Sequence, residues 1–487
     1  MYNKSDVVLY RAKEIRYPVK EYCFRPSEVY PEYVFSGDIA PVPNEVYDAV
    51  RNALYLLGLD SANYGNSDWN PLGELIRPGN CVLIKPNMVM DHNPTGEGTE
   101  CLYTQPSVVA AVIDYVVLAL KGQGRIVIGD APMQECKFEK LISESGYDAL
   151  IEYYKKRDVD ITLVDFRELK TEKVLGTRHQ IISKSDKGTI IDLKEQSEFA
   201  GMSEEQLKRV RITNYDPSRL NSHHMPGKHE YYISNYVLEA DVVINMPKPK
   251  THRKAGVTIG LKNLVGINVR KEFLPHHTQG SAVENGDEYR KKSILRHWAA
   301  IAYDKKNACE GNQKYFRSSI YRYIAELFNV LTHAIYKDEM EGNWHGNCTI
   351  SKTIVDLNKI LLYADKDGVM RDAVQRKVLN IADLIISGEK EGPVTPSPKM
   401  VGYIAAGVNS VNFDKVIGAM MGADIQRIPV LQNAENTDSK YKIAALEAPV
   451  IISNNSSIHA KRIEELQYEE KWNFVSTSGW KEIFEQE

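Results

Sequence analysis

Four short apolar runs, each followed by polar residues, constrain the fold of this chain more than any other feature. They read CVLIKP at 81–86, RIVIGD at 125–130, DITLVDF at 160–166 and ADVVINMP at 240–247. A helical pattern that begins at Pro106 and ends at Gly122 separates the first two runs, and a second helical stretch at 137–157 follows. Strands that alternate with helices over short connections predict a parallel sheet covered on both faces. The predicted fold class is therefore α/β.

The remainder of the chain extends this pattern. Helical stretches dominate residues 268–350, and strands and helices alternate again from 353. A chain of 487 residues has room for two or three domains. We predict two lobes with mostly parallel sheets flanked by helices, plus a helical insertion that serves as a lid, a wall of a cleft or a dimer interface. The predicted boundaries are 1–80 for an N-terminal extension packed on the core, 81–268 for the first lobe, 269–350 for the helical insertion, and 351–487 for the second lobe with an exposed, charged C-terminal tail.

Composition excludes several classes of protein. The formal net charge of −4 gives no general reason to expect a nucleic-acid partner. Six cysteines without a C-x-x-C pair do not fit a disulfide scaffold or a zinc ribbon, and no iron–sulfur cluster is expected. The N-terminal residues lack the apolar core of a signal peptide, and no apolar run is long enough to span a membrane. We therefore expect a cytoplasmic protein with no membrane partner, and a homo-oligomer is compatible with the pattern.

Polar residues follow the predicted strands at the point where each strand ends. In open α/β sheets ligands bind outside the carboxyl ends of the strands. Five residues there are candidates for binding a ligand or cofactor: Lys85, Asn87, Lys248, Lys262 and Asn263. A lysine ammonium suits a phosphate or carboxylate, and an asparagine amide can orient it. The alternatives are structural ion pairs or snorkelling for the lysines and a helix cap for Asn263.

Three further residues are candidates for catalysis: His252, Lys250 and Asp130. His252 lies in a predicted loop two residues after Lys250, where it could act as a general acid or base or bind a metal. A structural histidine with hydrogen bonds is the alternative. Of the adjacent pair His276 and His277, at most one is expected to point into a site, because adjacent side chains diverge.

Three carboxylates are candidates for a metal site. Asp383, Glu389 and Glu391 fall at the end of a predicted strand and in the turn after it. Clustered oxygen ligands suit Mg²⁺ or Mn²⁺, although a solvated turn explains the same residues. Phosphate-binding G-x-x-x-x-G-K-[ST] and G-x-G-x-x-G motifs are absent, as is a G-x-S-x-G elbow. The familiar nucleotide and hydrolase sites are therefore not indicated.

Several segments together resemble a known family. VLIKPNMV, TQPSVVAAVIDYVVLALKGQGRIVIGDAP and EADVVINMPKPKTHRKAGVTIGLKNLVGI are similar, in this order, to conserved blocks of the domain-of-unknown-function 362 family. The resemblance runs from about 81 to 430. Some family members carry a ferredoxin-like region, for which this chain lacks the cysteines. Where family members tend to read Asp-Gly-Ile, this chain has Asp383-Leu384-Ile385.

These features predict an enzyme that binds an anionic small molecule, phosphorylated or carboxylated, in a cleft between two lobes. Isomerisation, epimerisation and group transfer all fit such a site. The alternative is a non-catalytic protein that binds or carries a metal or cofactor. The sequence does not identify a cofactor, and a divalent ion, Mg²⁺ or Mn²⁺, is one candidate.

Overall fold

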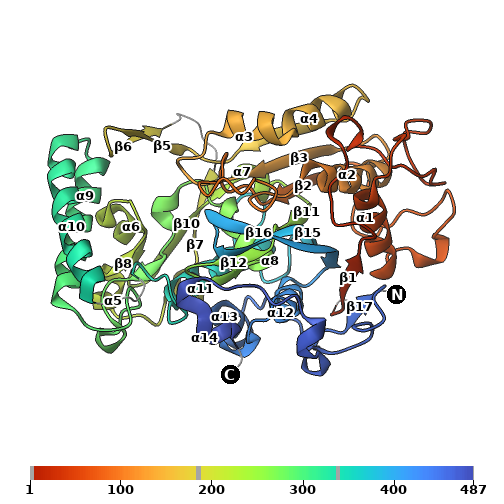
Figure 1. Ribbon diagram of the computed structural model, residues 1–487. Helices are drawn as coiled ribbons and strands as arrows, with labels where there is room; N and C mark the ends of the chain where they lie inside the picture. Colours follow the sequence, from red (N-terminus) through yellow and green to blue (C-terminus); the bar gives the residue numbers. More distant parts are fainter. Residues whose placement is uncertain (1–4, 183–187, 336–339, 486–487) are drawn as a thin grey trace.

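One large sheet forms the centre of the molecule. The structure is a computed structural model that describes residues 5–182, 188–335 and 340–485 (Figure 1). The strand order is β17 (Ile451–Ser453), β1 (Val7–Arg11), β16 (Thr395–Gly407), β15 (Lys377–Glu391), β11 (Val242–Met246), β2 (Cys81–Pro86), β3 (Arg125–Asp130) and β4 (Ile161–Asp165). Most neighbouring pairs are parallel, and β16 runs antiparallel to both β1 and β15. The predicted α/β class with a mostly parallel sheet is confirmed.

The strands predicted for two lobes belong to this one sheet. β11 pairs in parallel with β2 on one side and with β15 on the other. The N-terminal segment contributes β1, which lies between β16 and β17 within the sheet. All five residues of β11 are buried, so this strand needs a neighbour on each edge and a layer on each face. A buried run in the sequence predicts such a strand, but it does not say which strands become its neighbours.

Helices cover both faces of the sheet and bury two apolar layers. On one face lie α1 (Glu45–Leu56), α2 (Pro106–Leu120), α3 (Phe138–Ser145) and α4 (Tyr147–Lys155). On the other lie α11 (Thr349–Tyr363), α12 (Ser410–Met420) and α13 (Pro429–Asn436). Successive side chains of a strand point to opposite faces. Val82 and Ile84 therefore join the first layer, and Leu83 joins the second.

A smaller part of the chain extends the molecule beyond the sheet. Residues 169–234 include a hairpin of β5 (Leu169–Val174) and β6 (Thr177–Ile182), and a small sheet of β7 (Gly188–Asp192), β10 (Lys228–Ser234) and β9 (His224–Met225). The predicted helical insertion contains α9 (Ile294–Gly311) and α10 (Tyr315–Ile335), which pack side by side at the left edge of Figure 1. In the described part of the chain, no helix combines the length and apolar character needed to cross a membrane.

The end of the chain is not an exposed tail throughout. Residues 464–469 are largely exposed, whereas Trp480 is fully buried. Its indole Nε1 donates a hydrogen bond to the carbonyl of Arg253 at 2.6 Å. A Cβ on Gly256 would lie 2.5 Å from the Trp480 ring, so the indole packs directly on the hairpin of β12 (Lys250–His252) and β13 (Gly256–Thr258). Apolar residues that follow the charged run therefore attach the C-terminal segment to this hairpin. The charge pattern alone does not predict this attachment.

We predict that Trp480→Ala lowers the free energy of unfolding by about 3–5 kcal/mol, because it leaves a large cavity under the β12–β13 hairpin. Urea denaturation followed by far-UV circular dichroism measures this loss. Val475→Ala, at a half-exposed position of the same segment, is the control and should change the value by no more than about 0.5 kcal/mol. Equal small effects of both substitutions would show that the C-terminal segment does not hold the hairpin.

Candidate active site

The order of the strands defines where a ligand site is expected. From β2 the chain continues to β3 and β4 on one side, whereas from β11 it continues to β15 on the other. The connections therefore diverge between β2 and β11, and a crevice opens at the carboxyl ends of such strands. Lys85 of β2 and Asn245 of β11 are paired residues at these ends. Several residues around this point are among the candidate site residues predicted from the ends of the strands.

The side chain of Asn263 fills the base of the crevice. Its Nδ2 donates to the carbonyl of Lys85 at 3.1 Å and to Asn245 Oδ1 at 2.8 Å. Its Oδ1 accepts from Lys85 Nζ at 3.2 Å and from Asn87 Nδ2 at 3.0 Å. The amide thus connects the ends of both strands and is held in one orientation. Buried amides with all partners in place rigidify their surroundings.

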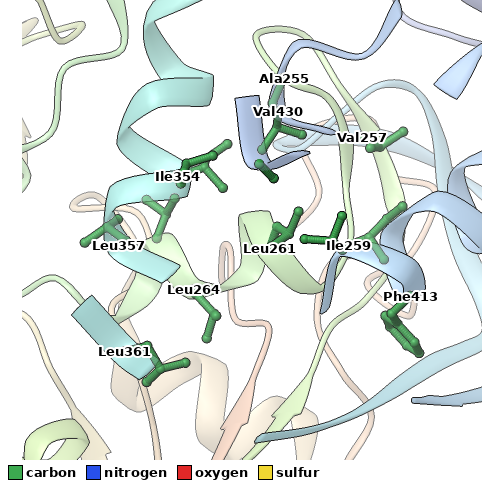
Figure 2. Close-up of a cluster of buried hydrophobic side chains, with 14 of the residues drawn as sticks. Ala255, Val257, Ile259, Leu261, Leu264, Ile354, Leu357, Leu361, Phe413 and Val430 are labelled. Carbon is green, nitrogen blue, oxygen red and sulfur yellow. The ribbon is translucent and has the colours of Figure 1, made fainter. Parts of the chain in front are cut away.

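The short helix α8 (Gly260–Asn263) presents Lys262 and Asn263 to the crevice because its other face is apolar. Leu261 and, just after the helix, Leu264 are fully buried. Figure 2 shows both leucines among side chains of α11, including Ile354, with Phe413 of α12 nearby. This packing fixes the rotation of the helix, so its polar residues lie opposite the apolar layer.

Hydrogen bonds from α11 and α12 fix the first two residues of α8. The Asp414 carboxylate of α12 accepts from the amides of Gly260 at 2.7 Å and Leu261 at 3.1 Å. Burial raises the pKa of Asp414 well above its ordinary value. The Asn358 side chain of α11 donates to the carbonyl of Leu261 at 3.1 Å. The position of Lys262 therefore depends on side chains nearly 100 residues and more than 150 residues further along the chain.

A cavity of about 390 Å³ lies against this crevice, within the size range of small-molecule sites. Five of the predicted site residues line it: Asn87, Asp130, His252, Lys262 and Asn263. No described residue of α9 or α10 lines it, so these two helices do not form a wall of the cleft. Glu341 and Asn343, which follow in the chain, contribute to the wall instead.

Lys85 and Lys250 support the wall and do not line it. Lys85 Nζ forms a salt bridge with Asp130 Oδ1 at 2.8 Å, and both side chains are buried. Lys250 Nζ donates to Asn87 Oδ1 at 2.5 Å and to the carbonyl of Leu102 at 3.0 Å. Each of these two lysines thus fixes a lining residue. Asp130 and Lys250, both predicted as catalytic, have their polar atoms engaged in this framework.

Three lysines that line the cavity have no carboxylate partner. Lys254, Lys262 and Lys271 line the wall, and among the described residues none of them forms a salt bridge. Burial lowers the pKa of Lys262 to about 7 and that of Lys271 to about 8, and the charge of Lys271 also lowers the pKa of Lys262. Lys254 donates to the backbone carbonyl of Glu341. Cations without a salt-bridge partner in a cavity are suited to attracting an anion.

Lys271 belongs to this cluster although the strand ends did not predict it. It lies in a 3-10 helix (Lys271–Phe273), and its Nζ is 3.4 Å from the carbonyl of Ala131. Reasoning from strand ends overlooks it because the residue reaches the cavity from a turn. The only signal available in the sequence was its proximity to Lys262 along the chain.

Two neutral histidines face the cavity with opposite hydrogen-bonding character. His252 Nδ1 accepts from the amides of Lys254 at 3.0 Å and Ala255 at 3.1 Å, so its proton lies on Nε2. His276 Nδ1 donates to the carbonyl of Leu274 at 2.8 Å, so its Nε2 is an acceptor. Burial and nearby lysines lower the pKa of both rings well below the ordinary value. The geometry favours a hydrogen-bond donor role for His252 over the predicted acid–base role.

His277, in contrast, does not line the cavity, as the divergence of adjacent side chains predicted.

The predicted metal ligands are not assembled. Asp383 forms a fully buried salt bridge with Lys248 at 2.9 Å and accepts from the Tyr17 hydroxyl at 2.7 Å. Glu391 pairs with Arg253 at 2.9 Å, and Glu389 accepts from the amide of Val475 at 2.9 Å. Within residues 5–182, 188–335 and 340–485, no group of three or more His, Cys, Asp or Glu side chains could hold a metal ion.

This difference has a structural reason. The strand predicted to end before Glu389 continues as β15 to Glu391 and pairs with β16, so no turn gathers the carboxylates. Lys248, predicted to bind the ligand, is instead the partner of Asp383.

An apolar wall completes the cavity. Its lining includes Met88, Val89, Met90, Met133, Ile212, Tyr215, Val265 and Val394. Methionine side chains are flexible and polarizable, so they adapt to the shape of a ligand. The cavity therefore suits a molecule with an anionic end and an apolar body.

The chain is similar to known proteins over the part that builds the cavity. The family model described as "Domain of unknown function (DUF362)" matches residues 82–189 and 181–419, over two thirds of the chain. The resemblance expected from the sequence is thus confirmed. The "Thylakoid-associated protein sll1697" of Synechocystis sp. is 28% identical over 195 residues, which are 40% of this chain. The match covers 41% of that relative, less than half of its length.

We predict that Lys262→Met stabilises the protein at neutral pH, by roughly 0.5 to 2 kcal/mol, because it removes a buried cation without a partner. Burial lowers the pKa of Lys262 from 10.5 to about 7 on folding. Between these values the unfolded chain binds more protons, so the stability of the wild type rises with pH. The advantage of the variant should be largest at and below pH 7 and should vanish towards the unfolded-state pKa.

Urea denaturation across this pH range measures the difference. Lys137→Met, at an exposed lysine outside the cavity lining, is the control and should show no such pH dependence. A Lys262→Met protein that is less stable than the wild type at every pH would show that Lys262 has a stabilising partner.

Proposed function

The chain belongs to the DUF362 family, and we propose that it is an enzyme that moves a proton within an anionic small molecule. An isomerase or epimerase acting on a phosphorylated or carboxylated substrate fits this role. The observation that carries the proposal is Lys262, an amine with a pKa of about 7 and no carboxylate partner among the described residues, on the wall of a 390 Å³ cavity. A lysine tuned in this way suits general base catalysis near neutral pH.

Binding of the substrate would use the charge of the cavity. Lys271 and Lys254 would neutralise the phosphate or carboxylate, and the apolar wall would contact the rest of the molecule. Asn87, which Lys250 holds in place, would orient a polar group through its amide.

The chemistry would need only the breaking and forming of a C–H bond. The neutral amine of Lys262 would take a proton from a carbon next to a carbonyl or carboxylate group. His252 would donate a hydrogen bond from Nε2 to the oxygen on which negative charge develops, as a neutral imidazole can do. The Lys262 ammonium would then return the proton to the other face of this carbon, after the planar intermediate has turned over in the cavity, or to a neighbouring atom. The first outcome is an epimerisation and the second an isomerisation.

A non-catalytic binding or carrier protein would use the same cavity without the proton transfer. Deuterium exchange separates the two roles, because only an enzyme of the proposed kind labels its ligand at carbon. The location stays a prediction: the sequence favours the cytoplasm, whereas the similar Synechocystis protein is named as associated with thylakoids.

We expect the gently purified protein to carry a stoichiometric anionic metabolite, which mass spectrometry identifies after denaturation. Lys271→Ala and Lys262→Ala should lose it, and Lys137→Ala should retain it. Incubation of the identified molecule with the wild type in D₂O should introduce deuterium at carbon. Lys262→Ala should slow this exchange by at least about 100-fold at saturating ligand, the usual size for loss of a general base. Bound ligand without exchange would identify a carrier.

We further expect the affinity for pyrophosphate, a defined anionic probe, to fall as the pH rises through 7 to 8. An anion binds the protonated lysines, and Lys262 and Lys271 lose their protons in the free protein with pKa values of about 7 and 8. The loss of the proton from each lysine should weaken pyrophosphate binding by up to about tenfold per pH unit above the pKa of that lysine. Isothermal titration calorimetry should show that Lys262→Met removes the lower of the two steps. An affinity that does not change between pH 6 and 9 would place the probe elsewhere.

A further inference from the structure

The helix α10 is oriented with its polar side inward. Ser318 and Ala325 are fully buried where α10 packs along α9. Ser318 Oγ donates to the Glu310 carboxylate at 3.1 Å, and Asn329 Nδ2 donates to the Tyr303 hydroxyl at 2.6 Å. Small and polar side chains therefore make much of the contact between α10 and α9.

The opposite side of α10 is apolar and exposed. We call these seven residues the outer stripe: Phe316 (81% exposed), Ile320 (46%), Tyr323 (63%), Ile324 (38%), Leu327 (59%), Val330 (68%) and Leu331 (44%). At 100° per residue they span about 120° of the helix, the width of an ordinary core-facing stripe. An amphipathic helix normally buries such a stripe. Here it faces outward at the edge of the molecule, with no other described element drawn beyond it (Figure 1).

The spacing of the outer stripe matches that of a helix that packs on another helix. Phe316, Ile320, Tyr323, Leu327 and Val330 follow one another at steps of four, three, four and three. This is the spacing of the apolar seam in coiled coils and helical bundles. The surface thus fits a second helix better than a flat or irregular partner.

The charge and the size of the outer stripe favour a second copy of the chain. The exposed residues at its two edges are Arg317 and Glu326, one of each sign, so the stripe has no bias towards an anionic membrane or nucleic acid. About half of seven large apolar side chains amounts to on the order of 700 Å², near the ~800 Å² that each partner buries in a stable interface. A symmetric dimer buries the same patch of both copies.

We propose that the chain forms a homodimer in which the outer stripes of two α10 helices pack against each other. The two α9–α10 hairpins then form a bundle of four helices. The cavity is not part of this interface, because no described residue of α9 or α10 lines it. The dimer therefore does not depend on the function proposed for the cavity.

Sedimentation velocity and light scattering of the full chain at micromolar concentration test the proposal. The wild type should be a dimer. Leu327→Glu and Tyr323→Glu should each raise the dissociation constant by about tenfold or more, because each places two charges in an apolar interface. Leu446→Glu, at a fully exposed leucine outside α10, is the matched control and should leave the dimer intact. Circular dichroism should show unchanged helix content, and Val330→Lys replaces any variant that fails to fold.

Two outcomes would overturn the proposal. The first is a wild type that stays monomeric, in which case flotation with vesicles of phosphatidylcholine or phosphatidylglycerol tests a lipid surface as the alternative partner. The second is a dimer that folded Leu327→Glu and Val330→Lys proteins retain at the wild-type dissociation constant. That result would place the interface on another surface.

Discussion

The hydrogen bonds of one buried amide hold the site together. The Asn263 side chain bonds to groups at the ends of both β2 and β11, and through Asn87 it reaches the cavity wall. In a region with little water each of these bonds is strong, and loss of any one would leave a buried polar group without a partner. The crevice between two parallel strands is thereby kept at a fixed width, and the positions of Lys262 and Asn87 follow from it.

The buried lysines of the site have two different energetic roles. Lys85 is paired with Asp130, and Lys248 with Asp383, so these cations contribute to a rigid framework. Lys262 and Lys271 lack such partners among the described residues, and burial lowers the pKa of each. Proteins rarely retain a buried cation without a partner unless function requires it. The contrast within one small region separates residues that build the site from residues available to a ligand.

The sequence predicted the class of fold and about half of the site, and the geometry of strand ends explains both results. Buried runs such as 240–247 predict strands reliably, and the residues after them reach the carboxyl edge. This pattern does not show in which direction a side chain points, so the salt bridge between Lys248 and Asp383 could not be predicted. Lys271 and His276 reach the cavity from turns and have no periodic signal. The prediction of a metal site is wrong because β15 continues to Glu391, so the carboxylates do not meet in a turn. The length of β15 depends on its pairing with β16.

The source of positive charge distinguishes this site from common phosphate sites. In those, the backbone amides at the start of a helix bind the anion. Here the first amides of α8 donate to the buried carboxylate of Asp414, so they are already occupied. Attraction for an anion must therefore come from side chains, chiefly Lys262 and Lys271. Backbone amides do not titrate near neutral pH, whereas these amines do, and this allows the same group to hold an anion in one protonation state and accept a proton in the other.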